Sequence, residues 1–325
     1  MKICVIGGAN VDISATSAGP FVAGDSNPGT VRIAPGGVGR NIAHNLALLG
    51  DEVSLVTVFG DDHLGRLLRE SCLAAGLDLS LSQVAAGARN ACFVSVNGSD
   101  GELLGGVADM AVTGLMTPDW LEERLDRING ADVVVADTNL PADTLALLVG
   151  GCLPPLYIDS VSSAKAVRLR AALLSSRLPG AGPVFVKCNR LEAEVLGLRP
   201  ARTASVPGDG GLAPLSSDVA PEYGADGQEA APADGFALPA SVARVYVSLG
   251  SEGLRVVEGG SVESFPALPV TGIVNATGAG DALLAGIVHA GADATAAQAA
   301  SLGQRCARLA MLSADAVSDA VRTLA

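Results

Sequence analysis

Lysine is scarce in this chain. The positions of the few lysines exclude one large class of nucleotide-binding protein. Only three of the 21 basic residues are lysines, at Lys2, Lys165 and Lys187, and none of them follows a glycine. A P-loop ends in Gly-Lys followed by Ser or Thr. The sequence therefore excludes a P-loop NTPase. Because the formal net charge is −13, we also expect no nucleic-acid or anionic-membrane partner.

Residues that build disulfides, metal centres and membrane spans are also few. The six cysteines form no Cys-x-x-Cys pair, and the three histidines lie far apart, without the spacing of metal ligands or of a catalytic triad. No apolar run reaches the roughly 18 residues that a membrane helix needs. The N-terminal stretch turns to Gly, Asn and Asp too soon for a signal peptide. We therefore expect a cytoplasmic protein whose thiols are free.

Hydrophobic residues are plentiful, at 49% of the 325, although aromatics make up only 3%. A core built from Ala, Val and Leu is therefore expected. Short apolar runs alternate with amphipathic stretches, a pattern typical of an α/β protein with a parallel sheet covered on both faces. The predicted strands are 3–6, 53–58, 133–136, 156–158, 184–186 and 245–249. The predicted helices include 41–49, 64–75, 118–128, 164–174, 191–198 and 282–290.

Two segments interrupt this alternation, and a third has an unusual composition. Residues 14–35 and 88–108 show strands and turns without a helix, including a predicted hairpin of 92–96 with 103–107. They are either a pair of surface loops or a small β-lid outside the main sheet, and we favour the lid. Residues 200–239 are rich in Pro, Gly, Ala and acidic residues, which predicts a loop or insertion without chemistry.

The most informative motif is Thr277-Gly278-Ala279-Gly280-Asp281, which leads into a predicted helix. Backbone N–H groups at a glycine-rich helix start suit an anionic phosphate. Asp281 beside such a phosphate suggests a general base that takes a proton from an attacking hydroxyl. The alternative is an ordinary helix start with a favourable acidic residue. A dinucleotide site is only weakly supported, because Leu283 stands where a small residue is needed.

Two further groups of polar residues follow predicted strands. The first group predicts a pocket for a polyol, in which a carboxylate accepts hydrogen bonds from neighbouring hydroxyls. It consists of Asn10, Asp12, Gly36, Gly37 and Asn41. Tight turns and a helix cap would explain the same residues.

Asn189 and Glu192 lie three apart, on one helical face. They could hold water around Mg²⁺, or they could form a capping box.

Taken in order, these motifs resemble those of the ribokinase (PfkB) family of sugar and nucleoside kinases. The resemblance implies a three-layer α/β/α fold with a mostly parallel sheet, a small β-lid, and a homodimer formed through that lid. It implies that ATP and Mg²⁺ are used and that Asp281 is the catalytic base. The implied anion hole is the turn of Gly278, Ala279 and Gly280, with the amides of Ala279–Asp281. Asn189 and Glu192 would organise the phosphates and Mg²⁺, with Glu192 toward the metal, and Asp12 would bind ribose hydroxyls. Further nucleotide-side residues implied by the resemblance are Ser248, Gly250, Gly253 and Thr277.

Within the family, segments such as 7–12, 36–43 and 137–141 are most similar to the members that act on pseudouridine. This implies ATP-dependent phosphorylation of the 5′-hydroxyl of pseudouridine, with Asn139 and Lys165 on the substrate side. Asn275 stands where many relatives carry aspartate, which weakens the expectation of a K⁺ site. Ser160 and Cys188 replace prolines that the family usually has. The alternatives are another sugar or nucleoside kinase of this family, or a catalytically silent nucleoside-binding protein.

Overall fold

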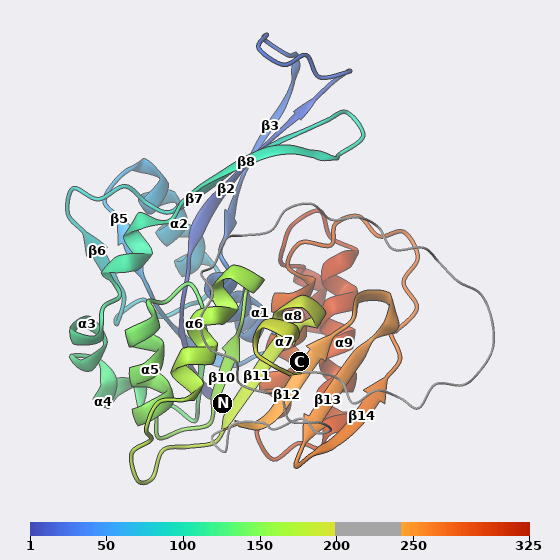
Figure 1. The fold of residues 1–325 in the computed structure, drawn as a ribbon. Coiled ribbons are helices and arrows are strands. Elements are labelled where there is room, and N and C mark those ends of the chain that lie inside the picture. The colour runs from blue at the N-terminus through green and yellow to red at the C-terminus, as the bar shows by residue number, and fades with distance from the viewer. Residues whose placement is uncertain (199–241) are drawn as a thin grey trace, which may run out of the picture.

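The main sheet is the element on which the rest of the molecule is built. The computed structural model describes residues 1–198 and 242–325, and in these ranges the sheet has eight strands with helices on both faces (Figure 1). The strand order is β14 (Ser261–Phe265), β13 (Leu254–Glu258), β12 (Val242–Ser248), β11 (Val184–Asn189), β10 (Leu156–Asp159), β9 (Val133–Asp137), β1 (Lys2–Ile6) and β4 (Glu52–Val56). Neighbours from β12 to β4 are parallel, whereas β13 and β14 are antiparallel.

The layers follow from the alternation of side chains along the strands. In β1, Ile3 and Val5 belong to one hydrophobic core, and Cys4 and Ile6 to the other. The first core is covered by α1 (Val38–Leu48), α2 (His63–Ala74), α8 (Ala279–Ala290) and α9 (Ala296–Met311). The second is covered by α3 (Pro118–Glu122), α4 (Leu125–Ile128), α5 (Ala142–Gly151), α6 (Ser163–Leu173) and α7 (Arg190–Val195). Short 3₁₀ helices are η1 (Ala111–Leu115), η2 (Gly250–Glu252) and η3 (Asp319–Leu324).

A second sheet of four strands projects from the body of the molecule (Figure 1). Its order is β3 (Gly29–Gly36), β2 (Asn10–Ser17), β7 (Cys92–Asn97) and β8 (Leu103–Asp109). The hairpin predicted for 92–107 is confirmed, because β7 and β8 are antiparallel neighbours. The two segments without helices, 14–35 and 88–108, therefore supply most of this projecting sheet.

Several boundaries predicted from the sequence are wrong, most clearly in the runs 53–58 and 118–128. The run 53–58 splits into β4 and β5 (Val58–Gly60), because the backbone of Thr57 bonds to Ser82 and Gln83 and β5 pairs with β6 (Gln83–Ala85). The helix 118–128 breaks after α3. There the N–H of Arg124 donates to Leu121, three residues back, and its guanidinium takes the Trp120 carbonyl oxygen that a continuing helix would use.

Among the predicted helices, α1 begins at Val38 instead of 41, and α7 ends at Val195 instead of 198. Strands β13 and β14 were not predicted. The tract 200–239 lies outside the described residues. None of the described helices combines the length and apolar character needed to cross a bilayer.

The strand register brings charged residues together at one edge. Asp159 at the end of β10 pairs in register with Asp137 of β9 and with Lys187 of β11. Because these strands are parallel, their carboxyl ends share the edge where α/β proteins place their sites.

Candidate active site

The amino end of α8 begins at Gly278, which caps the helix with a left-handed φ of 82°. A Cβ at this position would lie 2.0 Å from the carbonyl oxygen of Ala316, so only glycine fits. The helix starts at Ala279, three residues earlier than predicted, and Asp281 is its third residue. The N–H of Ala279 donates to Ala276, whereas those of Gly280 and Asp281 have no acceptor among the described residues. Two of the three predicted amides are thus available to an anion.

Asp281 is buried at this helix start, with 8% of its surface exposed. Its Oδ2 accepts a hydrogen bond from Asn41 Nδ2 at 2.9 Å. Burial and the charge of Asp159 raise the pKa of Asp281 to about 7, against the lowering effects of the Asn41 hydrogen bond and of Lys187. A carboxyl group with such a pKa can take and release a proton near neutrality, as a general base must.

Lys187 places a buried cation beside the same helix start. Its ammonium forms an ion pair with Asp159 at 3.0 Å. A Cβ on Gly280 would lie 2.8 Å from Lys187 Nζ, so the missing side chain lets the ammonium approach α8. Burial lowers the pKa of Lys187, but the nearby carboxylates of Asp159, Asp281 and Glu192 outweigh it and the net shift is upward. Sequence reasoning gave Lys187 no role, although a lysine inside an apolar strand was a usable signal.

Asn189 and Glu192 form the capping box of α7 with both of its reciprocal hydrogen bonds. Glu192 is 3% exposed, and both of its carboxylate oxygens already have donors. Oε2 accepts from Ser160 Oγ (2.6 Å) and from the Asn189 N–H (2.8 Å), and Oε1 from Asn189 Nδ2 (2.6 Å). The serine that replaces the family's proline is therefore a partner of Glu192.

This arrangement limits how Mg²⁺ could be held. No group of three acidic, His or Cys side chains in the described ranges could hold a metal ion. The residues fit an Mg²⁺ that is carried mainly by phosphates and water, with Glu192 acting through water. Bound in that way, the ion would neutralise phosphate charge.

Asp12 and the paired glycines form the next part of the site. Asn10 Nδ2 donates to Asp12 Oδ1 at 2.6 Å, and burial raises the pKa of Asp12. A Cβ on Gly36 would lie 2.1 Å from Asp12 Oδ2, so this glycine makes room for the carboxylate. Gly37, with φ of 99°, caps α1 and approaches the Gly8 carbonyl oxygen too closely for any side chain. Gly36 is thus needed for the position of the Asp12 side chain, and Gly37 for the path of the backbone.

Asn139 and Lys165 contact each other, with Lys165 Nζ donating to Asn139 Oδ1 at 2.5 Å. Beside them the buried Asp137 accepts from the N–H groups of Gly8, Gly39 and Asn139 at 2.8–2.9 Å. Asp137 ties the end of β1 to the start of α1, and sequence reasoning had given it no role of its own.

Ser248, Gly250 and Gly253 lie in the turn between β12 and β13. Ser248 Oγ donates to the Cys188 carbonyl oxygen at 3.3 Å. A Cβ on Gly253 would lie 2.1 Å from the Phe265 carbonyl oxygen, and φ is positive at both glycines. These contacts shape the turn, and none of them reaches Asp281.

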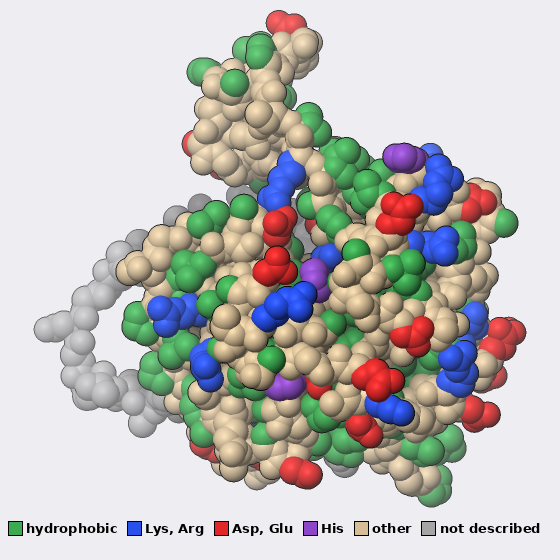
Figure 2. Space-filling model, turned by 180° about the vertical axis from the view of Figure 1, so that it is seen from behind, with side chains coloured by type: hydrophobic (Ala, Val, Ile, Leu, Met, Phe, Trp, Pro, Cys, Tyr) green, Lys and Arg blue, Asp and Glu red, His purple; other side chains and the backbone are tan. Residues whose placement is uncertain are grey.

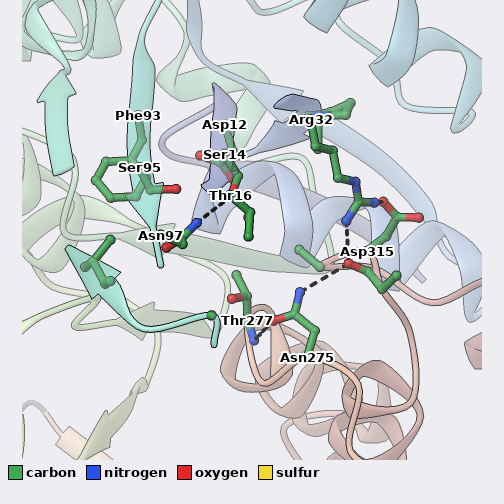
Figure 3. A pocket seen from close by; sticks show the side chains of 16 residues that line it. Asp12, Ser14, Thr16, Arg32, Phe93, Ser95, Asn97, Asn275, Thr277 and Asp315 are labelled. Carbon is green, nitrogen blue, oxygen red and sulfur yellow. Dashed lines mark hydrogen bonds and ion pairs between the residues drawn. The ribbon is translucent and has the colours of Figure 1, made fainter. Parts of the chain in front are cut away.

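A cavity of about 490 Å³ lies between the projecting sheet and the segments that flank α8 and α9 (Figure 3). One wall consists of polar side chains from β2 and β7, together with Phe93. Opposite them lie Asn275, Thr277 and the 314–316 loop. The polar wall is made by Asp12, Ser14, Thr16, Ser95 and Asn97. Apart from Asp12, sequence reasoning missed these side chains, because period-2 alternation does not tell which face of a strand meets a cavity.

Both the oxygen and the NH₂ group of the Asn275 side chain form hydrogen bonds within the protein. Its Oδ1 accepts from the Thr277 N–H at 2.9 Å and its Nδ2 donates to the Ala314 carbonyl oxygen at 3.2 Å (Figure 3). Arg32 of β3 donates to the same carbonyl oxygen at 2.7 Å and pairs with Asp315. Residue 275 therefore supplies no charged oxygen of the kind that an aspartate would offer to a K⁺ ion.

Comparison with known proteins relates this site to a protein family. The family model described as pfkB family carbohydrate kinase matches residues 1–196 and 223–323. The pseudouridine kinase of Escherichia coli is 30% identical over 311 residues, covering 95% of this chain and 90% of that protein. The guanosine-inosine kinase of Exiguobacterium acetylicum is 28% identical over 60% of this chain and 63% of that protein.

Among solved structures, Arabidopsis thaliana ribokinase, complexed with ribose and ATP, superposes with a TM-score of 0.73 at 17% identity. The match covers 99% of this chain and 96% of that one. This similarity confirms the predicted ribokinase-like fold. Together with the family match over most of the chain, it leads to one conclusion: the chain belongs to the pfkB family of carbohydrate kinases and is an ATP-dependent sugar or nucleoside kinase.

Proposed function

We propose that this kinase phosphorylates the 5′-hydroxyl of a nucleoside, and that the nucleoside is pseudouridine. The observation that carries the proposal is the similarity to a pseudouridine kinase along nearly the whole of both chains. The buried Asp281 beside open helix amides supplies the chemistry that such a transfer needs. The cavity volume lies within the roughly 300–1,000 Å³ typical of small-molecule sites.

Asp281 acts as the base in the proposed reaction. Its Oδ2 is held by Asn41, and its Oδ1 has no donor among the described residues, so Oδ1 is the atom that receives the proton. As the 5′-oxygen loses that proton, it forms a bond to the γ-phosphorus of ATP. The bond from this phosphorus to the β–γ bridging oxygen breaks, and ADP leaves with the electron pair.

The helix start and Lys187 stabilise the charge of the transferred group. The N–H groups of Gly280 and Asp281 have no acceptor among the described residues, and the ammonium of Lys187 lies next to Gly280, so these three donors are available to the negative charge that develops. Such fixed donors act without reorganisation, which makes them more effective than water. In this proposal Thr277, Ser248, Gly250 and Gly253 line the nucleotide side, and Asn189 and Glu192 would hold water around an Mg²⁺ ion that accompanies the phosphates.

The acceptor lies on the side of Asp12. This carboxylate accepts from the ribose hydroxyls, with Asn10 fixing its orientation at 2.6 Å. Gly36 and Gly37 leave space for the sugar, and Asn139 and Lys165 contact the acceptor from the β9 side. The projecting sheet would act as a lid that excludes water, which competes as an acceptor.

The opposite face of the projecting sheet supports the proposed homodimer. Cross-strand register places Val31, Ile33, Val94 and Val107 on the face away from the cavity, and these side chains are 38–71% exposed. The projecting part carries few charged side chains on the side seen in Figure 2. A second copy would cover this apolar face, which molar-mass measurement by light scattering tests.

The free cysteines support a cytoplasmic location, which fractionation tests.

The test is ADP release with Mg-ATP against pseudouridine, uridine, guanosine, adenosine, ribose and fructose, with mass spectrometry of each product. We expect a selective signal with pseudouridine and a 5′-monophosphate product. Turnover on another acceptor would keep the base and the fold but overturn the substrate. Ligand binding without ADP release on any acceptor would favour the silent binding protein.

A further inference from the structure

Arg40 is a buried cation without a counter-ion, one residue before Asn41. It lies in the first turn of α1 and is 5% exposed. None of the described carboxylates forms an ion pair with it, and its Nε has no hydrogen-bond partner. Both burial and the helix dipole disfavour a positive charge at this place. Packing alone therefore does not account for an arginine here.

The contacts of Arg40 point toward Asn41. Its Nη1 donates to Asn41 Oδ1 at 3.1 Å and more weakly to the Pro35 carbonyl oxygen at 3.5 Å, and its Nη2 donates to Ser71 Oγ at 3.3 Å. A guanidinium has donors only, so the atom of Asn41 that faces it must be the oxygen. The NH₂ group of the same amide then has to face Asp281, where Nδ2 lies 2.9 Å from Oδ2.

We propose that Arg40 is a positioning residue for proton transfer, which fixes the amide of Asn41 so that it donates to Asp281. This inference rests on the proposed role of Asp281 as the base. If the Asn41 amide were rotated by about 180°, its oxygen would face Asp281 Oδ2. Only the protonated form of Asp281 could then form a hydrogen bond to it. The base would then hold its proton when the hydroxyl needs to lose one. Arg40 thereby favours the ionised form of Asp281 without touching it.

Other charged groups also act on Asp281 and must stay constant in a test. Asp159 and Asp137 disfavour its ionisation, and Lys187 favours it. Arg40 is not in contact with any of these three. The charge of Arg40 also acts on Asp12, Cys72 and His44, so a change at Arg40 removes these effects together with the bond to Asn41. A comparison in an Asn41 variant background is needed to separate the two.

The experiment is the pH profile of kcat for the full-length protein with its best acceptor, in wild type, Arg40→Met and Arg40→Lys. In Arg40→Met we expect the acid limb to move upward by about one pH unit. We expect kcat at neutral pH to fall by roughly 10- to 100-fold, as misplaced catalytic groups do. Arg40→Lys keeps a donor and should lie close to wild type. The matched control is Ser71→Ala, which removes another partner of Arg40 and should leave the profile unchanged.

The decisive comparison adds Arg40→Met to Asn41→Ala. If Arg40 acts through Asn41, the double variant has the acid limb of Asn41→Ala alone. A further shift in the double variant, or a wild-type limb in Arg40→Met, overturns the proposal. Thermal melts check folding, and Arg40→Gln replaces Arg40→Met if the latter unfolds. If Asp281→Asn retains the wild-type rate, the proposed role of Asp281 as the base has failed, a result separate from that of Arg40.

Discussion

The buried edge of the main sheet and the cavity under the projecting sheet differ in how their polar groups are held. At the edge, Asp281, Lys187 and Glu192 are all less than 9% exposed, and each has a partner from another part of the chain or from its own helix cap. In the cavity, Ser14, Thr16, Ser95 and Asn97 are half-buried hydroxyls and amides, with Asn97 bonded to Ser14 at 2.9 Å. The first region is built from buried charges, whereas the wall formed by β2 and β7 consists, apart from Asp12, of neutral donors and acceptors.

This difference separates two tasks. Charges in a dry, fixed arrangement are effective for phosphoryl transfer, because nothing has to reorganise as the reaction proceeds. Neutral groups on a half-exposed wall can bond to a ligand at small cost and so suit the selection of a substrate. We therefore expect changes at the edge to act on kcat and changes in the cavity to act on KM.

The largest effect is expected from Asp281→Asn, which removes the base and keeps its shape. Turnover should fall by about 10²- to 10⁴-fold, the usual contribution of general base catalysis, while ATP binding persists. Steady-state kinetics and calorimetric titration with ATP measure both. A rate within a few-fold of wild type would remove Asp281 from the mechanism. The buried edge of the sheet would then not be the region that controls kcat.

The raised pKa of Asp281 gives this prediction a pH dependence. In the wild type, kcat should rise as pH increases through about 7, because the ionised carboxyl is the active form. Since the folded protein binds this proton more tightly than the unfolded chain, stability falls as pH rises from about 4 to about 7. Asp281→Asn should thus be more stable than wild type at pH 8, by at most about 4 kcal/mol. Melting curves at pH 5 and pH 8 check the sign.

The next effect is expected at Lys187. Lys187→Met should lower kcat by about 10²- to 10³-fold, as the loss of one fixed electrostatic group does. It also leaves Asp159 buried without its cation, which costs roughly 3–5 kcal/mol of stability. The double variant Lys187→Met, Asp159→Asn should regain stability but not turnover, and Asp159→Asn alone should keep more activity than the double. Recovery of turnover in the double variant would make Lys187 purely structural.

The smallest effect is expected in the cavity. Thr16→Val and Ser95→Ala each remove one hydroxyl and should raise KM for the nucleoside by about 2- to 10-fold, the value of one hydrogen bond. We expect kcat to stay within about twofold, because neither residue contacts Asp281. Val94→Ala, on the outer face of the strand that carries Ser95, is the matched control. Because Val94 lies on the proposed dimer face, the molar mass of this variant is checked against wild type. A loss of kcat without a change of KM would mean that the two regions are not separate.

The sequence carried much of the fold because local patterns encode it. Apolar runs of strand length predicted six strands, of which five lie in the main sheet at nearly the expected bounds, and the sixth splits at Thr57. The same reading missed β13 and β14, because Leu254–Glu258 has three apolar residues interrupted by an arginine, Ser261–Phe265 has only two, and neither is followed directly by a helix. The break at Arg124 also escaped it, because a side chain that takes its own helix carbonyl oxygen leaves no periodic signal.

The sequence by itself determined the family motifs, the glycines that the backbone requires at Gly37 and Gly278, and the helix start that carries Asp281. The motifs and the positive φ at the two glycines are local features, whereas the contacts that exclude a side chain there, with Gly8 and Ala316, come from distant parts of the chain. Only the tertiary structure decided that Lys187 lies beside Gly280 and that Arg40 orients Asn41 toward Asp281, 240 positions away. Such pairings, and the pKa of Asp281 that follows from them, come from burial and from strand register, because parallel strands bring distant residues to one edge.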